Sequence, residues 1–231
     1  VHPAPSVKEA TLVDWLKSKN INLSTISGEL RHGIVHRLDK ETSGVMVVAK
    51  NNEAHKKLSA QLEDKSMGRY YLAIINMPLK DNFIVDKAIG RNPNNRLKMS
   101  VIKNGKVAKS AFYKLCLSKD EKYELISAKL FTGRTHQIRV HLNSINRVIL
   151  GDSLYGFKSQ KDIIGRVFLH AFNLYLKHPS TGKMMSFESK LNSDMFNFLN
   201  DKFDMEYINE KIFNRSIESN FSNISDWMCK Q

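Results

Sequence analysis

Residues 109–131 read KSAFYKLCLSKDEKYELISAKLF, and this stretch decides the fold class. Apolar residues alternate with polar ones through 109–118 and again through 122–131, which is the pattern of half-buried strands. The polar run 119–122 between them predicts a tight reversal, so we expect an antiparallel pair. Further short strand patterns surround this pair, with helical patterns inserted between them. The sequence therefore predicts an α+β protein with a mixed, largely antiparallel β-sheet core and flanking helices.

The remaining elements follow from hydrophobic spacing and cap residues. Strand patterns occur at 45–49, 70–75, 84–89, 167–176 and 184–189. A short helix capped by Thr11 carries an apolar stripe of Leu12, Trp15 and Leu16, and a second helix begins at Asn51 or Asn52. Two more helices are expected at 135–145 and 193–203, and residues 91–106 read as an exposed basic loop or hairpin. Residues 204–231 are polar and Asn-rich, with no pattern that indicates regular structure.

Composition points to a polyanionic partner. The 231 residues include 36 Lys and Arg against 23 Asp and Glu, which gives a net charge of +13. Nucleic acid is the first candidate, although a merely solubilising Lys-rich surface explains the charge equally well. The basic residues are spread along the chain, so a nucleic acid would meet a folded face. The 42% of hydrophobic residues is enough to bury a core.

Several classes of protein are disfavoured. Two cysteines exclude a disulfide framework and a thiolate-rich metal site. No apolar stretch approaches the ~20 residues that span a bilayer, and the first residues do not resemble a signal peptide. We therefore expect a cytoplasmic protein without a membrane partner. The chain does not begin with Met, and we expect it to be cut from a longer chain.

The sequence lacks the common cofactor and nucleophile motifs. The sequence has no phosphate-binding loop, no dinucleotide glycine fingerprint and no Gly-x-Ser-x-Gly elbow. His136 and His141 are five residues apart, which does not place both on one helical face as metal ligands. An enzyme without cofactor or metal is the simplest catalytic option.

Two segments combine charge with tight turns: GIVHRLDKETSG at 33–44 and FTGRTHQIRVHL at 131–142. In the first, Asp39 lies between Arg37 and Lys40, which favours an ionised carboxylate; an Asx-turn aspartate is the plainer alternative. In the second, Arg134 follows a glycine and can fork onto a carboxylate or a phosphate, or simply lie on the surface. His136 and His141 are either general bases or hydrogen-bonded structural residues.

In these segments the chain resembles the RluA-type pseudouridine synthases, the family that includes the RluC- and RluD-like enzymes of the large ribosomal RNA. The resemblance runs from His2-Pro3 to about Ser189. Its ordered blocks are His36–Gly44, Arg69–Ala73, Thr132–Arg139 with His141-Leu142, Gly151-Asp152 with Tyr155-Gly156, Leu169-His170-Ala171 and His178-Pro179.

The resemblance implies an isomerase that converts uridine in RNA to its carbon-linked isomer without a cofactor. It implies that Asp39 is the essential carboxylate, either as a nucleophile or as a base that removes a ribose proton. Arg134 would pair with Asp39, and Tyr71 would lie against the uracil. Arg37 would fill the stack that the flipped uridine leaves. The remaining residues expected in RNA binding and base flipping are His36, Lys40, Thr42 and Arg139.

The resemblance also sets the expected organisation and partner. We expect a catalytic domain at 1–203, truncated at its N-terminus and without the family's S4-like domain, and a tail at 204–231. The expected partner is RNA, either 23S ribosomal RNA or a ribosome-assembly intermediate, bound by a monomer. Three alternatives stay open: a transfer RNA pseudouridine synthase, a non-catalytic RNA-binding or assembly module, and a metal-independent ribonuclease using His36, His136 or His141.

Overall fold

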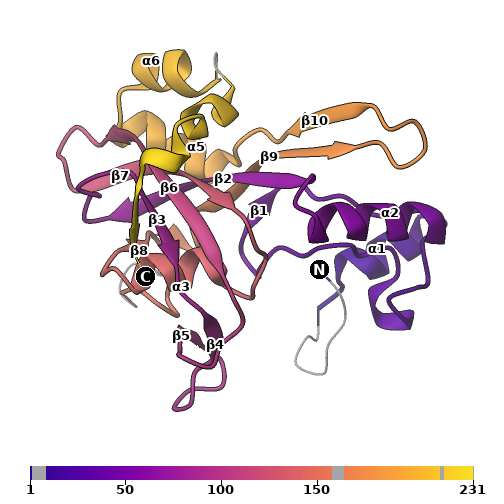
Figure 1. The fold of residues 1–231 in the computed structure, drawn as a ribbon. Helices are drawn as coiled ribbons and strands as arrows, with labels where there is room; N and C mark the ends of the chain where they lie inside the picture. Colours follow the sequence, from indigo (N-terminus) through magenta and orange to yellow (C-terminus); the bar gives the residue numbers. More distant parts are fainter. Residues whose placement is uncertain (2–8, 158–163, 214–215, 231) are drawn as a thin grey trace. The chain divides into compact units, whose positions relative to one another are not determined.

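The structure is a computed structural model that describes residues 1, 9–157, 164–213 and 216–230 (Figure 1). His2 and Pro3, where the resemblance begins, lie outside the described residues. The chain divides into two compact units. The first unit is made of Val1–Lys40, Val45–Gly68 and Leu174–Glu188, and the second of Glu41–Gly44, Arg69–Asn173 and Ser189–Gln231. The expected division into 1–203 and 204–231 stays a prediction.

Two capped helices organise the first unit: α1 (Leu12–Ser18) and α2 (Asn52–Glu63). Thr11 and Asp14 form a reciprocal capping box at α1, in which the Thr11 backbone N–H donates to Asp14 Oδ2 at 2.8 Å. Asn51 caps α2 by accepting a hydrogen bond from the Ala54 backbone N–H at 2.8 Å. Both start signals were readable in the sequence. The unit also contains the 3₁₀ turn η1 (Glu29–Arg31) and the strand β10 (Met184–Glu188).

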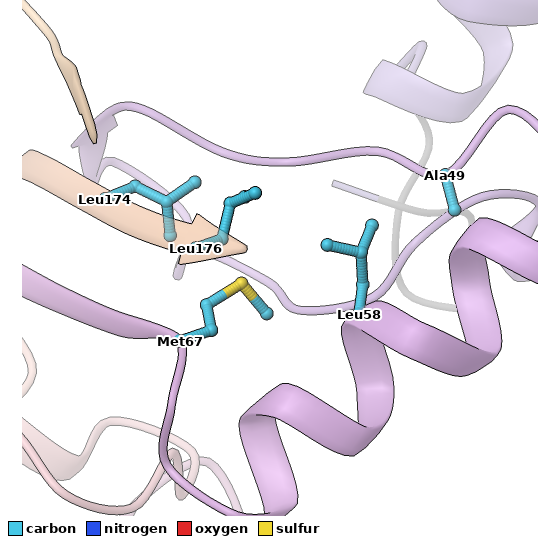
Figure 2. Close-up of a cluster of buried hydrophobic side chains, with 5 residues drawn as sticks. All are labelled: Ala49, Leu58, Met67, Leu174 and Leu176. Atoms are coloured by element: carbon cyan, nitrogen blue, oxygen red, sulfur yellow. The ribbon is translucent and has the colours of Figure 1, made fainter. Parts of the chain in front are cut away.

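A small apolar cluster forms the core of the first unit. Figure 2 shows the side chains of Ala49, Leu58, Met67, Leu174 and Leu176 gathered between α2 and the end of β9 (Leu169–Lys177). Each of these side chains is no more than 4% exposed, so the cluster fixes α2 against the strand by burial of apolar surface.

The stripe expected on α1 was partly wrong. Val13 and Leu16 are the buried residues of this helix, whereas Trp15 is 53% exposed. Over seven residues, two neighbouring faces of a helix carry similar apolar patterns, and the side packed inward is decided by the rest of the unit.

A mixed sheet forms the second unit, with the strand order β1-β9-β2-β7-β6-β3-β11, and β8 pairs with β2. The antiparallel pairs are β2 with β7, β6 with β7, and β3 with β6, whereas β1 runs parallel to β9 and β11 parallel to β3. The bounds are β1 (Ser43–Gly44), β2 (Gly68–Asn76), β3 (Phe83–Asp86), β6 (Lys109–Leu117), β7 (Tyr123–Leu130), β8 (Val148–Ile149) and β11 (Met228–Lys230).

The antiparallel pair expected at 109–131 is confirmed as β6 and β7, with Phe112 opposite Ala128. β2 is buried along its whole length, which explains why its sequence is a continuous apolar run instead of an alternation. The largely antiparallel α+β architecture predicted from the sequence is therefore confirmed.

Outside the main sheet, the second unit has a hairpin and the helices α3, α5 and α6. The basic stretch at 91–106 belongs to the hairpin of β4 (Ile89–Arg91) and β5 (Met99–Val101), which lies next to α3 (Gln137–Asn143) (Figure 1). The helix α5 (Ser193–Lys202) agrees closely with the predicted one and is followed by α6 (Met205–Ile208).

Two expectations about the elements were wrong. Residues 45–49 do not form a strand: β1 is the pair Ser43–Gly44, and only an isolated bridge joins Val48 to Ile34. The stretch at 84–89 is divided between β3 and β4, because the chain leaves the main sheet to enter the hairpin. No element was assigned to the tail from the sequence, and its described residues form α6, the π-helix η3 (Asn209–Phe213), the 3₁₀ turns η4 (Ile217–Phe221) and η5 (Ile224–Asp226), and the edge strand β11.

The described part of the chain contains no helix with the length and apolar character needed to cross a membrane.

Candidate active site

The buried side chain of Gln137 organises the loop that carries Arg134. Its Oε1 accepts hydrogen bonds from the Thr132 hydroxyl at 2.7 Å and from the Arg134 backbone N–H at 2.9 Å. Its Nε2 donates to the Lys109 carbonyl and to Ser110 Oγ, both at 2.9 Å. The Gln137 amide thus joins the loop to β6, because its oxygen binds the loop and its nitrogen binds β6. A buried group that is fully hydrogen-bonded in this way holds its surroundings in one arrangement.

The side chain of Arg134 is exposed but not loose. Its Nε donates to the Val107 carbonyl at 2.9 Å, while its backbone is held by Gln137. The guanidinium is therefore oriented before any ligand arrives, with further N–H groups that can fork onto an anion.

Arg69 approaches the same loop from the start of β2. A Cβ atom at Gly133 would lie 3.1 Å from Arg69 Nη2, so a side chain at this position would press on the guanidinium. Within the described residues, the buried Nε of Arg69 has no hydrogen-bond partner. The sequence placed Arg69 in a family block but gave it no role. The structure therefore brings a second guanidinium to the Arg134 loop.

Tyr71 lies two residues further along β2, opposite Ala128 of β7, and is 4% exposed. Because β2 is an interior strand of the sheet, the ring position is set by the ladder on both sides. Tyr71 is thus a core residue of the second unit, a role that does not conflict with contact to a ligand.

Asp39 belongs to the first unit, near its boundary with the second. It is half-buried, whereas Arg37 and Lys40 on either side are exposed. His36 is buried, and its Nε2 accepts a hydrogen bond from the Val47 backbone N–H at 3.1 Å. Lys40 Nζ lies 3.9 Å from Glu9 Oε2 in an exposed ion pair, which contributes little to stability.

The residues that follow Asp39 are held firmly in the second unit. Ser43 pairs with His170 in the parallel ladder of β1 and β9, and its hydroxyl lies 2.8 Å from His170 Nδ1. His170 Nε2 donates to the Ser189 carbonyl at 3.0 Å, and burial lowers the pKa of this imidazole. A neutral His170 therefore accepts the hydrogen bond from Ser43.

Arg166 also holds the segment Glu41–Gly44 in place, and these contacts together are the anchor of residues 41–44. Arg166 Nη1 donates to the Glu41 carbonyl at 3.3 Å, and its Nε and Nη2 donate to the carboxylate of Asp194, the second at 2.9 Å. The hydrogen bonds from Arg166 lower the pKa of Asp194. Neither residue was singled out in the sequence, because an Arg–Asp pair 28 positions apart leaves no local pattern. The segment Glu41–Gly44 is thus tied to β9, Arg166 and α5.

Thr42 and Arg139 were both expected to contact RNA, and both expectations stay predictions. Thr42 Oγ1 is buried without a hydrogen-bond partner among the described residues. Arg139 is 7% exposed and forms a bidentate ion pair with the buried Asp152, with Nε 2.7 Å from Oδ2 and Nη2 2.9 Å from Oδ1. With these N–H groups committed to Asp152, Arg139 supports the turn at 152–155.

The histidines offer little to a ribonuclease. His141 is fully buried between Ser110 Oγ and the Lys87 carbonyl, and burial lowers its pKa to about 4. His136 Nδ1 is 2.8 Å from the Tyr155 hydroxyl, and its backbone is left-handed at the start of α3. Within the described ranges, no three His, Cys, Asp or Glu side chains are grouped so that they could hold a metal ion.

The structure assigns the expected catalytic residues to both units. Arg134 and Tyr71 belong to the second unit, which also holds Arg69 and the anchor of residues 41–44. Asp39 belongs to the first unit, so its pairing with Arg134 stays a prediction.

Comparison with known proteins identifies the family. A family model described as RNA pseudouridylate synthase matches residues 1–144, and the chain belongs to this family. An uncharacterised RNA pseudouridine synthase of Helicobacter pylori strain J99 is 50% identical over 218 residues, covering 91% of this chain and 66% of that protein. Ribosomal large subunit pseudouridine synthase D of Nitrosomonas europaea is 42% identical over 202 residues, covering 84% of this chain and 57% of that protein.

A solved structure supports the fold. Human RNA pseudouridylate synthase domain containing 1 matches with a TM-score of 0.66 and 24% identity, covering 78% of this chain and 74% of that one. The chain spans 66% or less of the length of the two bacterial relatives. The resemblance to the RluA-type family inferred from the sequence is confirmed.

Proposed function

We propose that this chain isomerises uridines in RNA to pseudouridines, with Asp39, Arg134 and Tyr71 as the catalytic residues. Membership of the family supports the reaction, and the pre-oriented Arg134 is the structural observation that carries it. The relative from Nitrosomonas europaea, named as an enzyme of the large ribosomal subunit, supports 23S ribosomal RNA as the substrate. The expectations of a monomer, a cytoplasmic location and no cofactor stay predictions.

The reaction needs one carboxylate, one cation and a proton route. The bond between uracil N1 and ribose C1′ breaks, the uracil turns within the site, and C5 bonds to C1′. The proton on C5 then moves to N1, so that no atom is gained or lost. Asp39 acts either by attack on the sugar or base, or by removal of a ribose proton, and both roles require its ionised form.

Arg134 stabilises that ionised form by pairing with it, which is worth most where water is excluded. Tyr71 lies against the uracil face and serves in the proton transfer from C5. Arg37 is exposed, so it is free to replace the flipped uridine in the RNA stack, where a planar guanidinium fits between bases. The net charge of +13 supplies contacts to phosphates.

The test compares Asp39→Asn with Asp81→Asn, a matched change at an exposed position. Release of tritium from uracil C5 measures isomerisation of ribosomal RNA transcripts, and a filter assay measures binding. Asp39→Asn should lower the rate by about 10³-fold or more while binding persists. Asp81→Asn should match the parent chain. Equal isomerisation by both variants would contradict the catalytic role of Asp39. A parent chain that binds RNA but releases no tritium would favour an RNA-binding module, and strand scission would indicate a ribonuclease.

A further inference from the structure

A cavity of about 300 Å³ lies in the second unit between the β4–β5 hairpin and α3. Its apolar wall includes Val140 of α3, and its polar wall includes Asn92, Ser100 and Asn143. The volume is at the lower end of the ~300–1,000 Å³ typical of ligand sites, which suits one small planar molecule. None of the residues in its lining takes part in the proposed isomerisation.

The ring of Tyr155 forms a fixed aromatic side of this cavity. The Met99 backbone N–H donates to the Tyr155 hydroxyl at 2.8 Å, and the same hydroxyl is 2.8 Å from His136 Nδ1. These two contacts set the orientation of the ring. Lys98 Nζ lies 5.9 Å from the ring centroid, so a cation accompanies the aromatic surface.

Three polar side chains of the lining keep hydrogen-bonding atoms uncommitted. Asn92 uses its Oδ1 to accept from two backbone N–H groups of its own loop, which leaves its Nδ2 as a donor. Asn143 donates from Nδ2 to the Tyr155 carbonyl at 3.0 Å, which leaves its Oδ1 as an acceptor. Ser100 Oγ is buried and has no hydrogen-bond partner in the part of the chain that the structure describes. An unpaired buried hydroxyl is costly, so a ligand that pairs with it gains affinity.

The charge around the cavity selects an anionic ligand. Residues 89–106 contain five Lys and Arg residues and no Asp or Glu. Such a strand pair attracts phosphates, whereas the donor and acceptor atoms inside the cavity match the edge of a nucleobase.

We propose that this cavity binds one nucleotide of the RNA other than the uridine that is isomerised, with its base beside Tyr155 and its phosphates at the basic hairpin. The inference rests on the proposed function in that the nucleotide is part of the same RNA. It adds a second point of recognition, which would help to select the substrate through a base outside the reaction itself.

The experiment uses two cavity variants and one matched control in the full chain. Asn143→Trp fills the mouth of the cavity from the exposed last turn of α3, and Asn104→Trp makes the same change at an exposed hairpin position outside the lining. Ser100→Ala removes the buried hydroxyl, which has no protein partner, so it should fold normally. Chemical shifts of backbone and side-chain amides are followed while each of the four ribonucleoside monophosphates, or inorganic phosphate, is added.

We expect one or more monophosphates to shift the Asn92, Ser100 and Asn143 signals in a saturable way, and inorganic phosphate to leave them unchanged. Asn143→Trp should abolish this binding and raise KM for RNA about tenfold without changing kcat, because loss of one held base costs about that much affinity. Ser100→Ala should weaken binding severalfold, and Asn104→Trp should match the parent chain.

Two results would overturn the inference: equal shifts with inorganic phosphate, or unchanged monophosphate binding and KM in both cavity variants. Binding of monophosphates by a chain that lacks isomerase activity would refute the proposed function and still support the cavity as a nucleotide site.

Discussion

The guanidinium of Arg139 donates two hydrogen bonds, of 2.7 and 2.9 Å, to the carboxylate of Asp152, and both side chains are buried. Asp152 Oδ1 also accepts from the backbone N–H groups of Leu154 and Tyr155, both at 3.0 Å. One carboxylate thereby joins α3 to the turn at 152–155, which in turn holds Tyr155 beside the nucleotide cavity.

Asp152→Ala should therefore destabilise the protein strongly. The change leaves a buried guanidinium without its counter-ion, which typically costs ~3–5 kcal/mol of unfolding free energy. The control is Glu53→Gln, which breaks the exposed Lys57–Glu53 pair on α2 and should change stability by less than ~1 kcal/mol. Urea denaturation of both variants measures the difference, and a small loss in Asp152→Ala would show that water reaches Arg139.

The anchor on residues 41–44 should affect turnover more than stability. Asp194→Asn weakens the hold on Arg166 and, through it, on the Glu41 carbonyl, so the segment after Asp39 is less well positioned. Misplacement of a reacting group by about 1 Å can cost ~10²-fold in rate, and we expect kcat to fall by roughly ten- to a hundredfold with little change in KM.

The matched control for this change is Asp201→Asn on the same helix α5, where the carboxylate is exposed and pairs with Lys202. It should leave kcat unchanged. A higher KM with an unchanged kcat in Asp194→Asn would instead place Arg166 in RNA binding.

Gly44 is the one position in this anchor where a side chain cannot be fitted. Its φ is +117°, and a Cβ would lie 2.2 Å from the Ala171 carbonyl oxygen, a backbone atom that cannot move aside. Gly44→Ala should separate β1 from β9 and cost roughly 1–3 kcal/mol more than Gly182→Ala. Gly182 also has a positive φ, of +70°, but has open space around it. Equal melting temperatures of the two variants would show that β1 is not held in place.

The sequence predicted the elements that are set by patterns over a few neighbouring residues, and it missed those that are set by contacts between distant residues. The β6–β7 pair and the caps of α1 and α2 follow from alternation, turn residues and cap chemistry over a few positions. The fold of the tail does not: Phe221 packs its ring 5.2 Å from Tyr70, and Trp227 packs 5.9 Å from Tyr113. These aromatic residues look isolated in a polar sequence because their partners lie on strands more than a hundred residues away.

The candidate site shows the same division. The motifs singled out Asp39 and Arg134, which belong to contiguous blocks, and Gln137 lies in one of those blocks without an expected role. Arg139 was expected to bind RNA because it is basic and lies in a family block, and only the position of Asp152 on the next turn reveals that it is a buried ion-pair partner. Basic residues that meet RNA and those that meet a buried carboxylate have the same signature in a sequence.

His141 should make the stability depend on pH in mildly acid solution. Burial lowers its pKa to about 4 in the folded chain, against an ordinary value of 6.5, although the hydrogen bond to the Lys87 carbonyl and the charge of Asp86 oppose this shift. Between these two values the unfolded chain binds a proton that the folded chain does not, so stability falls as the pH is lowered from about 6.5 to about 4. The full difference is on the order of 3 kcal/mol.

The variant His141→Gln removes this titration and keeps an amide that can donate to the Lys87 carbonyl. Its unfolding free energy should therefore fall less steeply across the same pH interval, although it starts lower at neutral pH. The pKa of His170 is also lowered by burial, so His170 contributes a slope of the same sign that remains in the variant. Parallel pH profiles for the parent chain and His141→Gln would mean that folding does not lower the pKa of His141.

The pairing of Asp39 with Arg134 is testable by a double-mutant cycle on kcat/KM. If the guanidinium acts by holding Asp39 ionised and oriented, Arg134→Ala should not lower kcat/KM further once Asp39 is replaced. The double variant should then be no slower than Asp39→Ala alone, since residues that act as one unit are strongly non-additive. Arg134→Lys should recover only part of the activity, because an ammonium cannot form the two-pronged contact. Independent effects that add in free energy would place Arg134 on a phosphate of the RNA, and the salt dependence of binding should then weaken by about one unit of slope.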